Sequence, residues 1–370
     1  MATALWIVLY LVLFCVGVMF VVWGSNGVVM GATLINKLTK VPMFFLGMFM
    51  VALATTSPEF TVNVFATIDG NVQIAIGNIV GSNIFNIAAI LGLCATMRGI
   101  HTSRDIVVKQ VPLATASIMI LGVLCFDGEL TRLDGTILLG FFSIYLIYLY
   151  ISARKATKHA KETVEEETEE EAEEPRFLNI FWEILFVVID WFKSLVGKEK
   201  HAQRKVYEAT GDTIHPVTKL LIYLIIGFSI LIGGSRVMVT SAVALATIAG
   251  VPEAFIGLTI VAMGTSMPEL AVSIMAIIKK KKDLALGNIV GANTFNALWA
   301  LGFDTFFLRS LPFDRGNMID IYMAFGVAFF LWAFMYIGKR YELERWQGFV
   351  FLFGYVIYVG YKYVSLTAIQ

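Results

Sequence analysis

The amino-acid sequence predicts an all-α membrane protein with ten transmembrane helices, arranged as two five-helix repeats of inverted topology with the N-terminus outside. The composition, the long apolar segments and an internal repeat lead to this fold class. Apolar residue types make up 58% of the 370 residues, charged types make up 15%, and mean hydropathy is +0.77. Because soluble domains have about 45–50% apolar and about 25% charged residues, we expect the chain in a bilayer.

Ten apolar segments are long enough to be membrane spans. About 20 apolar residues in a helix cross the roughly 30 Å of bilayer hydrocarbon. The first segment begins near the N-terminus without a basic region or a cleavage site, so we interpret it as a span and not as a signal peptide. The expected spans are residues 5–35, 42–68, 72–97, 107–126, 135–153, 217–247, 252–278, 284–307, 318–337 and 346–366.

The loops between these spans predict the orientation. Basic residues concentrate in alternate loops, for example at 154–161 and 279–282, whereas Asp127 and Glu129 lie in a loop of the opposite set. Basic loops stay in the cytoplasm, so we expect the N-terminus outside. The zero net charge gives no indication of nucleic-acid binding.

The expected domains are a first repeat at 1–153, a cytoplasmic linker at 154–215 and a second repeat at 216–370. The linker contains nine glutamates within residues 162–174. Such a block does not bury apolar surface, so we interpret it as a solvated spacer, with a calcium-concentrating tail as the alternative. Residues 177–198 carry a narrow polar stripe at helical spacing, which predicts an amphipathic helix in the membrane interface.

The internal repeat is visible without gaps when the chain is shifted by 210 residues. Residues 41–92 then align with 251–302, and about 23 of 52 positions are identical. Each half holds five expected spans, which is an odd number, so the second half enters the membrane from the opposite side. Inverted repeats of this kind are typical of secondary transporters, whose binding sites lie near the midplane at interrupted helices.

The repeated peptides "ATTSPEF" (54–60) and "GTSMPEL" (264–270) are the strongest candidates for a site. Pro58 and Pro268 each remove a backbone donor inside a span, which frees a carbonyl oxygen. Glu59 and Glu269 place acids at membrane depth, where ionisable residues are functional by default. The alternative is a protonated acid that bonds a neighbouring helix. Hydroxyl oxygens stand one turn earlier, at Thr55, Thr56, Thr265 and Ser266.

The next span in each half contains "GNIVGSNIFN" (77–86) or "GNIVGANTFN" (287–296). Ser82 and Asn86 share a helical face, and so do Ala292 and Asn296. The donor set contains only oxygen, which suits hard cations such as Ca²⁺. The histidines lie outside the spans, and we expect no disulfide framework, no cofactor and no softer metal. We interpret the remaining four amides as packing groups, although they could also be ligands: Asn78, Asn83, Asn288 and Asn293.

These paired segments resemble the two alpha-repeats of the calcium/cation antiporter superfamily, which includes the sodium/calcium exchangers. The resemblance implies a ten-helix fold in which the two long helices, at spans 1 and 6, slide across the core. It implies that Glu59 and Glu269 bind Ca²⁺ together with the carbonyl oxygens of Thr55 and Thr265. It also assigns to flanking sodium sites the hydroxyls of Thr56, Ser266 and Ser82, the carbonyls of Ala52 and Ala262, and Asn86, with Asn296 as the repeat mate of Asn86.

Two positions depart from the family pattern. Ala292 stands where its repeat mate is Ser82, so one hydroxyl is missing, and Asn296 stands where some relatives carry aspartate. The site then has two negative charges, which match one Ca²⁺ or two monovalent ions. These departures put the sodium stoichiometry in question, and with it the identity of the coupling ion.

The sequence thus predicts a secondary antiporter that exchanges Ca²⁺ for Na⁺ in a membrane, with a prokaryotic inner membrane as the expected location. Alternatives on the same fold are Ca²⁺/H⁺ exchange and export of Mg²⁺ or Mn²⁺. The inverted repeat with its pair of acids argues against an ion channel. The sequence contains no catalytic motif that would indicate an intramembrane enzyme. The expected partners are the lipid bilayer and inorganic cations, the expected cargo ions are Ca²⁺ and Na⁺, and the chain is expected as a monomer.

Overall fold

The structure is a computed structural model that describes residues 2–39, 41–165, 220, 222–249, 262–313 and 315–367. The expected interfacial helix at 177–198 lies outside the described residues, as does most of the acidic block at 162–174. Where the linker is described, it is helical, because α8 (Arg132–Glu165) continues past the expected end at residue 153. Alanine, lysine and glutamate in this stretch have high helix propensity.

The first half is helical throughout its spans, with a break in the second span and π-helical turns (η) in three of them. Interruptions of this kind often mark functional positions. The elements are α1 (Ala2–Thr39), α2 (Met43–Leu46), η1 (Gly47–Val51), α3 (Ala52–Thr55), α4 (Ser57–Ile68), α5 (Val72–Ile84), η2 (Phe85–Leu91), α6 (Gly92–Met97), η3 (Ile106–Gln110), α7 (Val111–Leu124) and α8.

The second half repeats this order in its described residues. A π-helical segment begins at Phe295, which is 210 residues after the one that begins at Phe85, so the irregularity belongs to the repeat. The elements are η4 (Ile222–Ile226), α12 (Gly227–Ile248), α14 (Ala262–Thr265), α15 (Met267–Ile278), α16 (Lys282–Thr294), η6 (Phe295–Ala300), α17 (Leu301–Phe303), η7 (Asp304–Leu308), α18 (Arg315–Phe334) and α19 (Arg345–Thr367).

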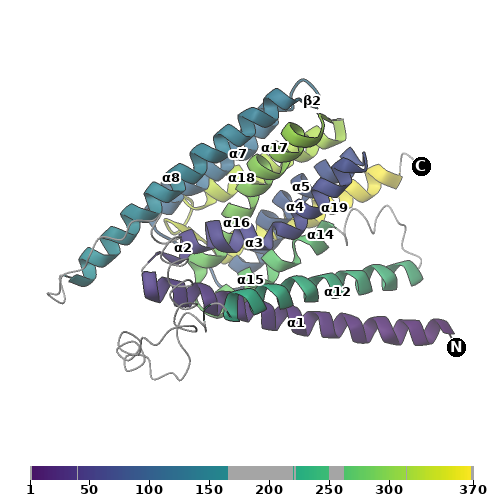
Figure 1. Ribbon diagram of the computed structural model, residues 1–370, viewed down its shortest axis with the longest axis horizontal. Coiled ribbons are helices and arrows are strands. Elements are labelled where there is room, and N and C mark those ends of the chain that lie inside the picture. The colour runs from purple at the N-terminus through teal and green to yellow at the C-terminus, as the bar shows by residue number, and fades with distance from the viewer. Residues whose placement is uncertain are drawn as a thin grey trace, which may run out of the picture.

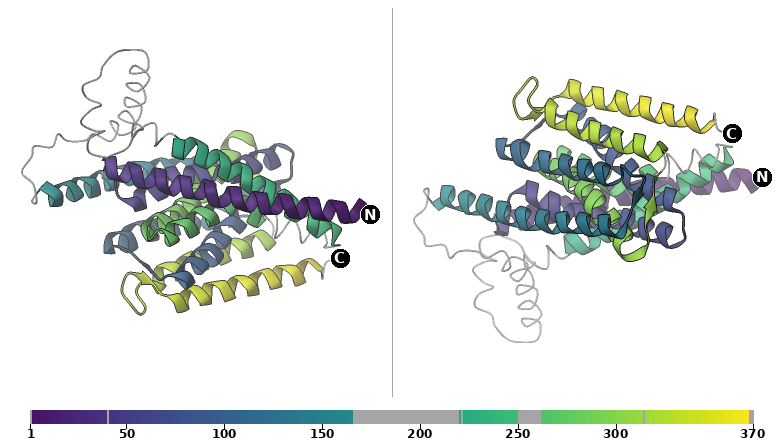
Figure 2. Two further views of the ribbon diagram at one scale, coloured as in Figure 1. Left: turned by 90° about the horizontal axis from the view of Figure 1, so that it is seen from below. Right: turned by 90° about the horizontal axis from the view of Figure 1, so that it is seen from above.

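The apolar helices make the chain a multi-pass membrane protein. Five described helices are long and apolar enough to cross a membrane, and the bent pair Met43–Thr55 and Ser57–Ile68 adds a sixth if it is one span. The full set of ten spans and the outside N-terminus stay predictions. Long apolar helices α1 and α12 lie side by side along one face of the molecule, and the remaining helices form a bundle behind them (Figures 1 and 2).

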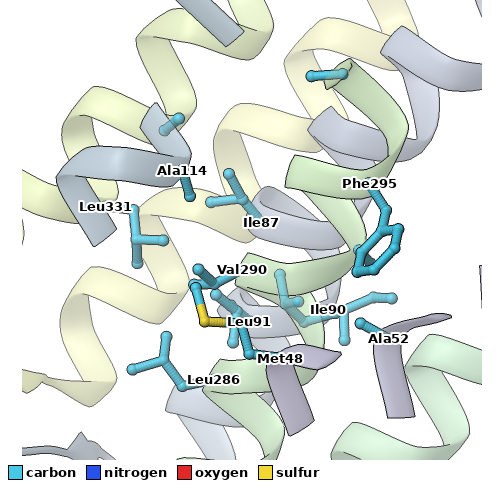
Figure 3. Close-up of a cluster of buried hydrophobic side chains, with 14 of the residues drawn as sticks. Met48, Ala52, Ile87, Ile90, Leu91, Ala114, Leu286, Val290, Phe295 and Leu331 are labelled. Carbon is cyan, nitrogen blue, oxygen red and sulfur yellow. The ribbon is translucent and has the colours of Figure 1, made fainter. Parts of the chain in front are cut away.

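The middle of the molecule is a close contact between α16 and the segment α2–η1–α3. A Cβ atom on Gly47 would lie 2.5 Å from the Leu284 carbonyl oxygen, and one on Gly291 would lie 2.7 Å from the Ala52 Cβ. Only glycine permits such an approach. Figure 3 shows the apolar side chains around this contact, with Met48 and Ala52 facing α16. The two halves therefore pack directly on each other at the core.

Two short strand pairs join loops of the two halves, and we call them the clasps. In the first clasp β1 (Ile100–His101) pairs with β4 (Glu342–Leu343), and in the second β2 (Glu129–Leu130) pairs with β3 (Leu311–Pro312). Both pairs are antiparallel, and the facing residues Ile100 with Leu343 and Leu130 with Leu311 are fully buried. Because β1 and β2 lie at opposite ends of η3–α7, the halves are joined at both ends.

Candidate functional site

Each repeat has a helix break directly before its glutamate. Helix α3 ends at Thr55 and α4 starts at Ser57, with a bend of 42° between the two parts of the span. In the second half α14 ends at Thr265 and α15 starts at Met267. Proline lies in the first turn of α4 and of α15, where its missing N–H is tolerated. Residues at both breaks are buried, among them Thr55, Thr56 and Ser266.

The two glutamates are fully buried at these breaks. Glu59 and Glu269 have no exposed surface, and each lies in the first turn of its helix. The N-terminal end of a helix carries partial positive charge, which favours an anion there. The two carboxyl groups are also close enough to interact electrostatically with each other. The breaks therefore concentrate two acids in one interior region.

A hydroxyl group from each repeat binds the glutamate of the other repeat. Thr56 Oγ1 donates to Glu269 Oε1 at 3.2 Å, and Ser266 Oγ donates to Glu59 Oε1 at 2.8 Å. Thr56 and Ser266 occupy equivalent positions, as do Glu59 and Glu269. We call these two contacts the crossed bonds. They bring the four polar residues of the repeated peptides together in a single site.

Two asparagines hold the breaks in place. Asn288 Oδ1 accepts from Thr55 Oγ1 at 3.2 Å, and Asn78 Oδ1 accepts from Thr265 Oγ1 at 3.1 Å. Their amide nitrogens donate to the backbone carbonyl oxygens of Glu269 and Glu59, at 3.4 and 3.3 Å. Each asparagine thus links the two breaks to each other, because it bonds the threonine of one break and the glutamate backbone of the other.

The symmetry of the site ends at the two unusual positions. Ser266 Oγ lies 3.1 Å from Ser82 Oγ, but Ala292 has no hydroxyl to offer Thr56 in the equivalent place. Asn86 Nδ2 donates to Asn293 Oδ1 at 2.9 Å, whereas both polar atoms of the Asn296 amide are buried without a partner. Of these residues, Ser82 contacts the crossed bonds through Ser266, whereas Asn86 bonds the amide of Asn293.

Several oxygen atoms of the predicted ligands are buried without a donor. Glu59 Oε2, Glu269 Oε2, Asn86 Oδ1 and Asn296 Oδ1 have no hydrogen-bond partner. Buried acceptors of this kind are costly unless a donor or a cation satisfies them. The described residues contain no group of three or more His, Cys, Asp or Glu side chains that could hold a metal ion. A cation here would therefore rely on two carboxylates and on neutral oxygens.

One predicted carbonyl ligand, that of Ala52, already accepts hydrogen bonds within its own helix. The Ala52 carbonyl oxygen accepts from Thr56 N at 2.9 Å and from Thr55 Oγ1 at 3.3 Å. Ala262 is the first described residue after the gap at 250–261. A small pocket lies beside the first break, and one of its lining residues is Thr56, the donor of the crossed bond to Glu269. Its lining residues are Leu53, Thr56, Ser57, Phe60, Phe295, Trp299 and Ala300.

Sequence reasoning missed a further buried acid besides the two glutamates. Asp304 has no exposed surface and accepts hydrogen bonds from Asn63 Nδ2 and Thr67 Oγ1. The signal was present, because Asp304 lies inside the expected span 284–307, but its position is not duplicated in the first half. Asp304 therefore gives no signal in an alignment of the two repeats, where its counterpart is Cys94.

The comparisons with known proteins agree with this geometry. The family model described as "Sodium/calcium exchanger protein" matches residues 9–151 and 219–364. The chain is 29% identical over 358 residues to the "Putative antiporter CaxA" of Alkalimonas amylolytica, covering 95% of this chain and 97% of the relative. It is 26% identical over 356 residues to the "Sodium/calcium exchanger MaX1" of Methanosarcina acetivorans, covering 93% and 95%.

A solved structure has the same fold. It is the sodium-calcium exchanger NCX_Mj soaked with 2.5 mM Na⁺ and 10 mM Sr²⁺, and it superimposes with a TM-score of 0.71. The sequences are 26% identical, and the match covers 96% of this chain and 99% of the other. The similarity therefore extends over both halves of the chain.

Proposed function

The chain belongs to the sodium/calcium exchanger family, and from this premise we propose that it is a secondary antiporter exchanging Ca²⁺ for Na⁺ at the site of Glu59 and Glu269. The family consists of transporters and not of enzymes. The crossed bonds are the observation that carries the proposal. They bring the two buried carboxylates into one interior site with oxygen acceptors that lack a donor.

The charge of the site supports exchange between one divalent and two monovalent ions. Two carboxylates neutralise one Ca²⁺ or two Na⁺. Ca²⁺ takes six to eight oxygens in flexible geometry, and Glu59 and Glu269 would supply carboxylate oxygens beside the carbonyls of Thr55 and Thr265. Because both ion types need the same two acids, each would expel the other. This competition provides the coupling that antiport requires.

The sodium ions would be held by neutral oxygens on both sides of the glutamates. The proposed ligands are Thr56, Ser266, Ser82, Asn86, Asn296 and the carbonyls of Ala52 and Ala262. Thr56 and Ser266 could bind Na⁺ without losing a crossed bond, since a hydroxyl that donates its hydrogen to a carboxylate still has lone pairs for a cation. The amide oxygen of Asn296, which has no hydrogen-bond partner, would also be available.

Alternating access would use α1 and α12, which lie on one face of the bundle. Their contact is made through glycines, because a Cβ on Gly17 would lie 2.7 Å from the Met238 backbone nitrogen and one on Gly234 would lie 2.6 Å from Phe20 Cβ. The clasps join the other helices and leave these two free of strand pairing within the described residues. We therefore assign the sliding motion to this pair.

The topology completes the proposal: two inverted five-helix repeats, an outside N-terminus, a cytoplasmic linker and a prokaryotic inner membrane. The offset of 210 residues between equivalent contacts supports the repeat. The loop charges support the orientation, and the bacterial relative supports the location.

Tracer uptake into proteoliposomes tests the proposed function. Outward gradients of Na⁺, K⁺ and H⁺ are imposed in turn, and ⁴⁵Ca²⁺ uptake is followed. We expect uptake driven by Na⁺ alone, and we expect Glu59→Gln and Glu269→Gln each to abolish it. Full Na⁺-driven uptake in both variants would exclude the site.

Coupling to H⁺ is the second candidate, and Ala292 and Asn296 are the observations that favour it. The missing hydroxyl and the neutral amide remove oxygen ligands or charge that a sodium site would use. Uptake driven by a pH gradient without Na⁺ would establish Ca²⁺/H⁺ exchange. Competition by Mg²⁺ or Mn²⁺ in the same assay would show whether another divalent cation is the cargo.

A further inference from the structure

Helix α4 carries a buried polar stripe that leads away from the central site. Glu59, Asn63 and Thr67 follow at steps of four residues, so they share one helical face, and all three are fully buried. Asn63 and Thr67 lie about 6 and about 12 Å beyond Glu59 along the axis, at 1.5 Å per residue. Of these three residues only Glu59 belongs to the proposed exchange site, so Asn63 and Thr67 need their own explanation.

The outer part of the stripe surrounds Asp304, at the start of η7. Asn63 Nδ2 and Thr67 Oγ1 both donate to Asp304 Oδ2, the second at 2.8 Å. Asp304 Oδ1 and Asn63 Oδ1 are buried and have no partner. Within the described residues Asp304 forms no salt bridge. The cluster thus combines one negative charge with two bare acceptor oxygens.

The charged groups on the neighbouring elements do not neutralise Asp304. Arg309, beyond the end of η7, donates to the Ile68 carbonyl oxygen at 3.4 Å. Helix α8 packs on η7, and its Asp134 accepts from Thr131. The other charged residues near these ends, Asp69 and Arg132, are exposed. On α4 itself the nearest charge is Glu59, which is also negative.

The equivalent positions in the other repeat show that packing alone does not require this cluster. At an offset of 210 residues Asp304 corresponds to Cys94, and Thr67 corresponds to Ile277. Cys94 and Ile277 are as buried as their counterparts, yet they form no polar site. A neutral pair fills the equivalent place in the other repeat, so the acid is present in one repeat only.

We propose that Asp304, Asn63 and Thr67 form a second cation site, which binds one monovalent cation, Na⁺ or H⁺, between Glu59 and the end of α4. A single positive charge neutralises the single carboxylate, and both bare oxygens are acceptors that such a cation satisfies. Ca²⁺ is a poor fit, because it prefers several carboxylates and six or more oxygens. In part this rests on the proposed function, in which a coupling ion entering from this end meets Asp304 before Glu59.

Binding without transport tests this site separately from the exchange site. The background is the purified Glu59→Gln/Glu269→Gln protein, in which the central carboxylates are neutral. Its thermal unfolding is followed while Na⁺ replaces choline at constant ionic strength, and in a second series while pH is varied. We expect a saturable rise in Tm with Na⁺, or a rise on acidification, that disappears when Asp304→Asn is added.

The matched control is Asp283→Asn in the same background, since Asp283 is also an acid that accepts a hydrogen bond from a threonine, Thr102 Oγ1 at 3.0 Å, although it is less buried than Asp304. The control should keep the response. A response that survives Asp304→Asn, that is lost equally in the control, or that is absent from the background overturns the proposal. A Na⁺ response identifies a sodium site, and a response to pH alone identifies a proton site.

A second variant covers the case in which Asp304→Asn does not fold. Thr67→Val keeps the carboxylate and removes one donor, so the half-saturating Na⁺ concentration or the proton midpoint should shift by about tenfold, the effect of one hydrogen bond to a charged group. An unchanged midpoint would contradict the site. Because neither readout needs exchange, loss of the proposed transport function and loss of this site are distinguishable.

Discussion

Replacing Gly47 by alanine should loosen the contact between the halves and weaken cation binding. The added Cβ would lie 2.5 Å from the Leu284 carbonyl oxygen and 2.9 Å from the Asn288 backbone nitrogen, whereas ordinary contacts begin at 3.4 Å. Both neighbours are backbone atoms of α16, so no flexible side chain can give way. The two segments must separate by nearly 1 Å, and overpacking of this kind costs about 1–3 kcal/mol.

The displacement reaches the site through Asn288. This residue accepts from Thr55 at one break and donates to the Glu269 carbonyl oxygen at the other. Moving it stretches bonds of 3.2 and 3.4 Å, which have little tolerance before they are lost. We therefore expect Gly47→Ala to lower both Tm and the apparent Ca²⁺ affinity, the latter by about tenfold if one such bond to the site is lost.

Thermal unfolding with and without Ca²⁺ measures both effects. The matched control is Gly326→Ala in α18, where an added Cβ meets no atom within 4 Å and alanine favours the helix by about 1 kcal/mol. This control should be as stable as the parent or more stable. If Gly47→Ala unfolds at the parental temperature with parental Ca²⁺ affinity, the close contact between Gly47 and α16 does not stabilise the site.

Three further predictions concern the site itself. Removing Ca²⁺ with a chelator should lower the Tm of the parent, because Ca²⁺ at 100 times its Kd adds about 2.7 kcal/mol to the free energy of unfolding. The same treatment should have no effect after Glu59→Gln/Glu269→Gln. Equal responses in unfolding scans would argue against the acids as ligands. Ser266→Ala and Thr56→Val should each weaken exchange by about tenfold or more, since each removes a bond to a buried carboxylate, and uptake assays showing only one of them impaired would contradict the equivalence of the crossed bonds. Asn296→Asp adds a third negative charge, so it should increase the number of Na⁺ moved per Ca²⁺; reversal potentials that stay constant in proteoliposomes would place position 296 outside the sodium sites.

The sequence was sufficient for the parts of the molecule that are duplicated or strongly apolar. Duplication of the Thr-Ser-Pro-Glu region identified the breaks and the glutamates that the structure brings together, although their ion-binding role stays a prediction. The pairing of Thr56 with Glu269, and of Ser266 with Glu59, could not be predicted, because no local pattern states which repeat supplies the partner of a buried acid.

Other features depend on contacts that a local pattern does not contain. The clasps consist of strands of two residues each, and β1 and β4 are more than 200 residues apart in the chain, so no periodicity reveals them. Asp304 is unique to the second half, and its partners Asn63 and Thr67 become meaningful only when α4 and η7 are adjacent. The helical extension of α8 to Glu165 follows from propensity, which a charge-based domain boundary at 154 does not consider.

The crossed bonds have a consequence for how such a molecule could arise. Each repeat carries a buried acid whose hydroxyl donor belongs to the other repeat. A shorter chain with a single repeat would therefore leave its acid unsatisfied, at a cost of several kcal/mol, until a second copy supplied the missing donor. An ancestral half-length gene would thus have encoded a subunit of an obligate homodimer, and fusion of two copies would have allowed Ala292 and Asp304 to appear in one half alone.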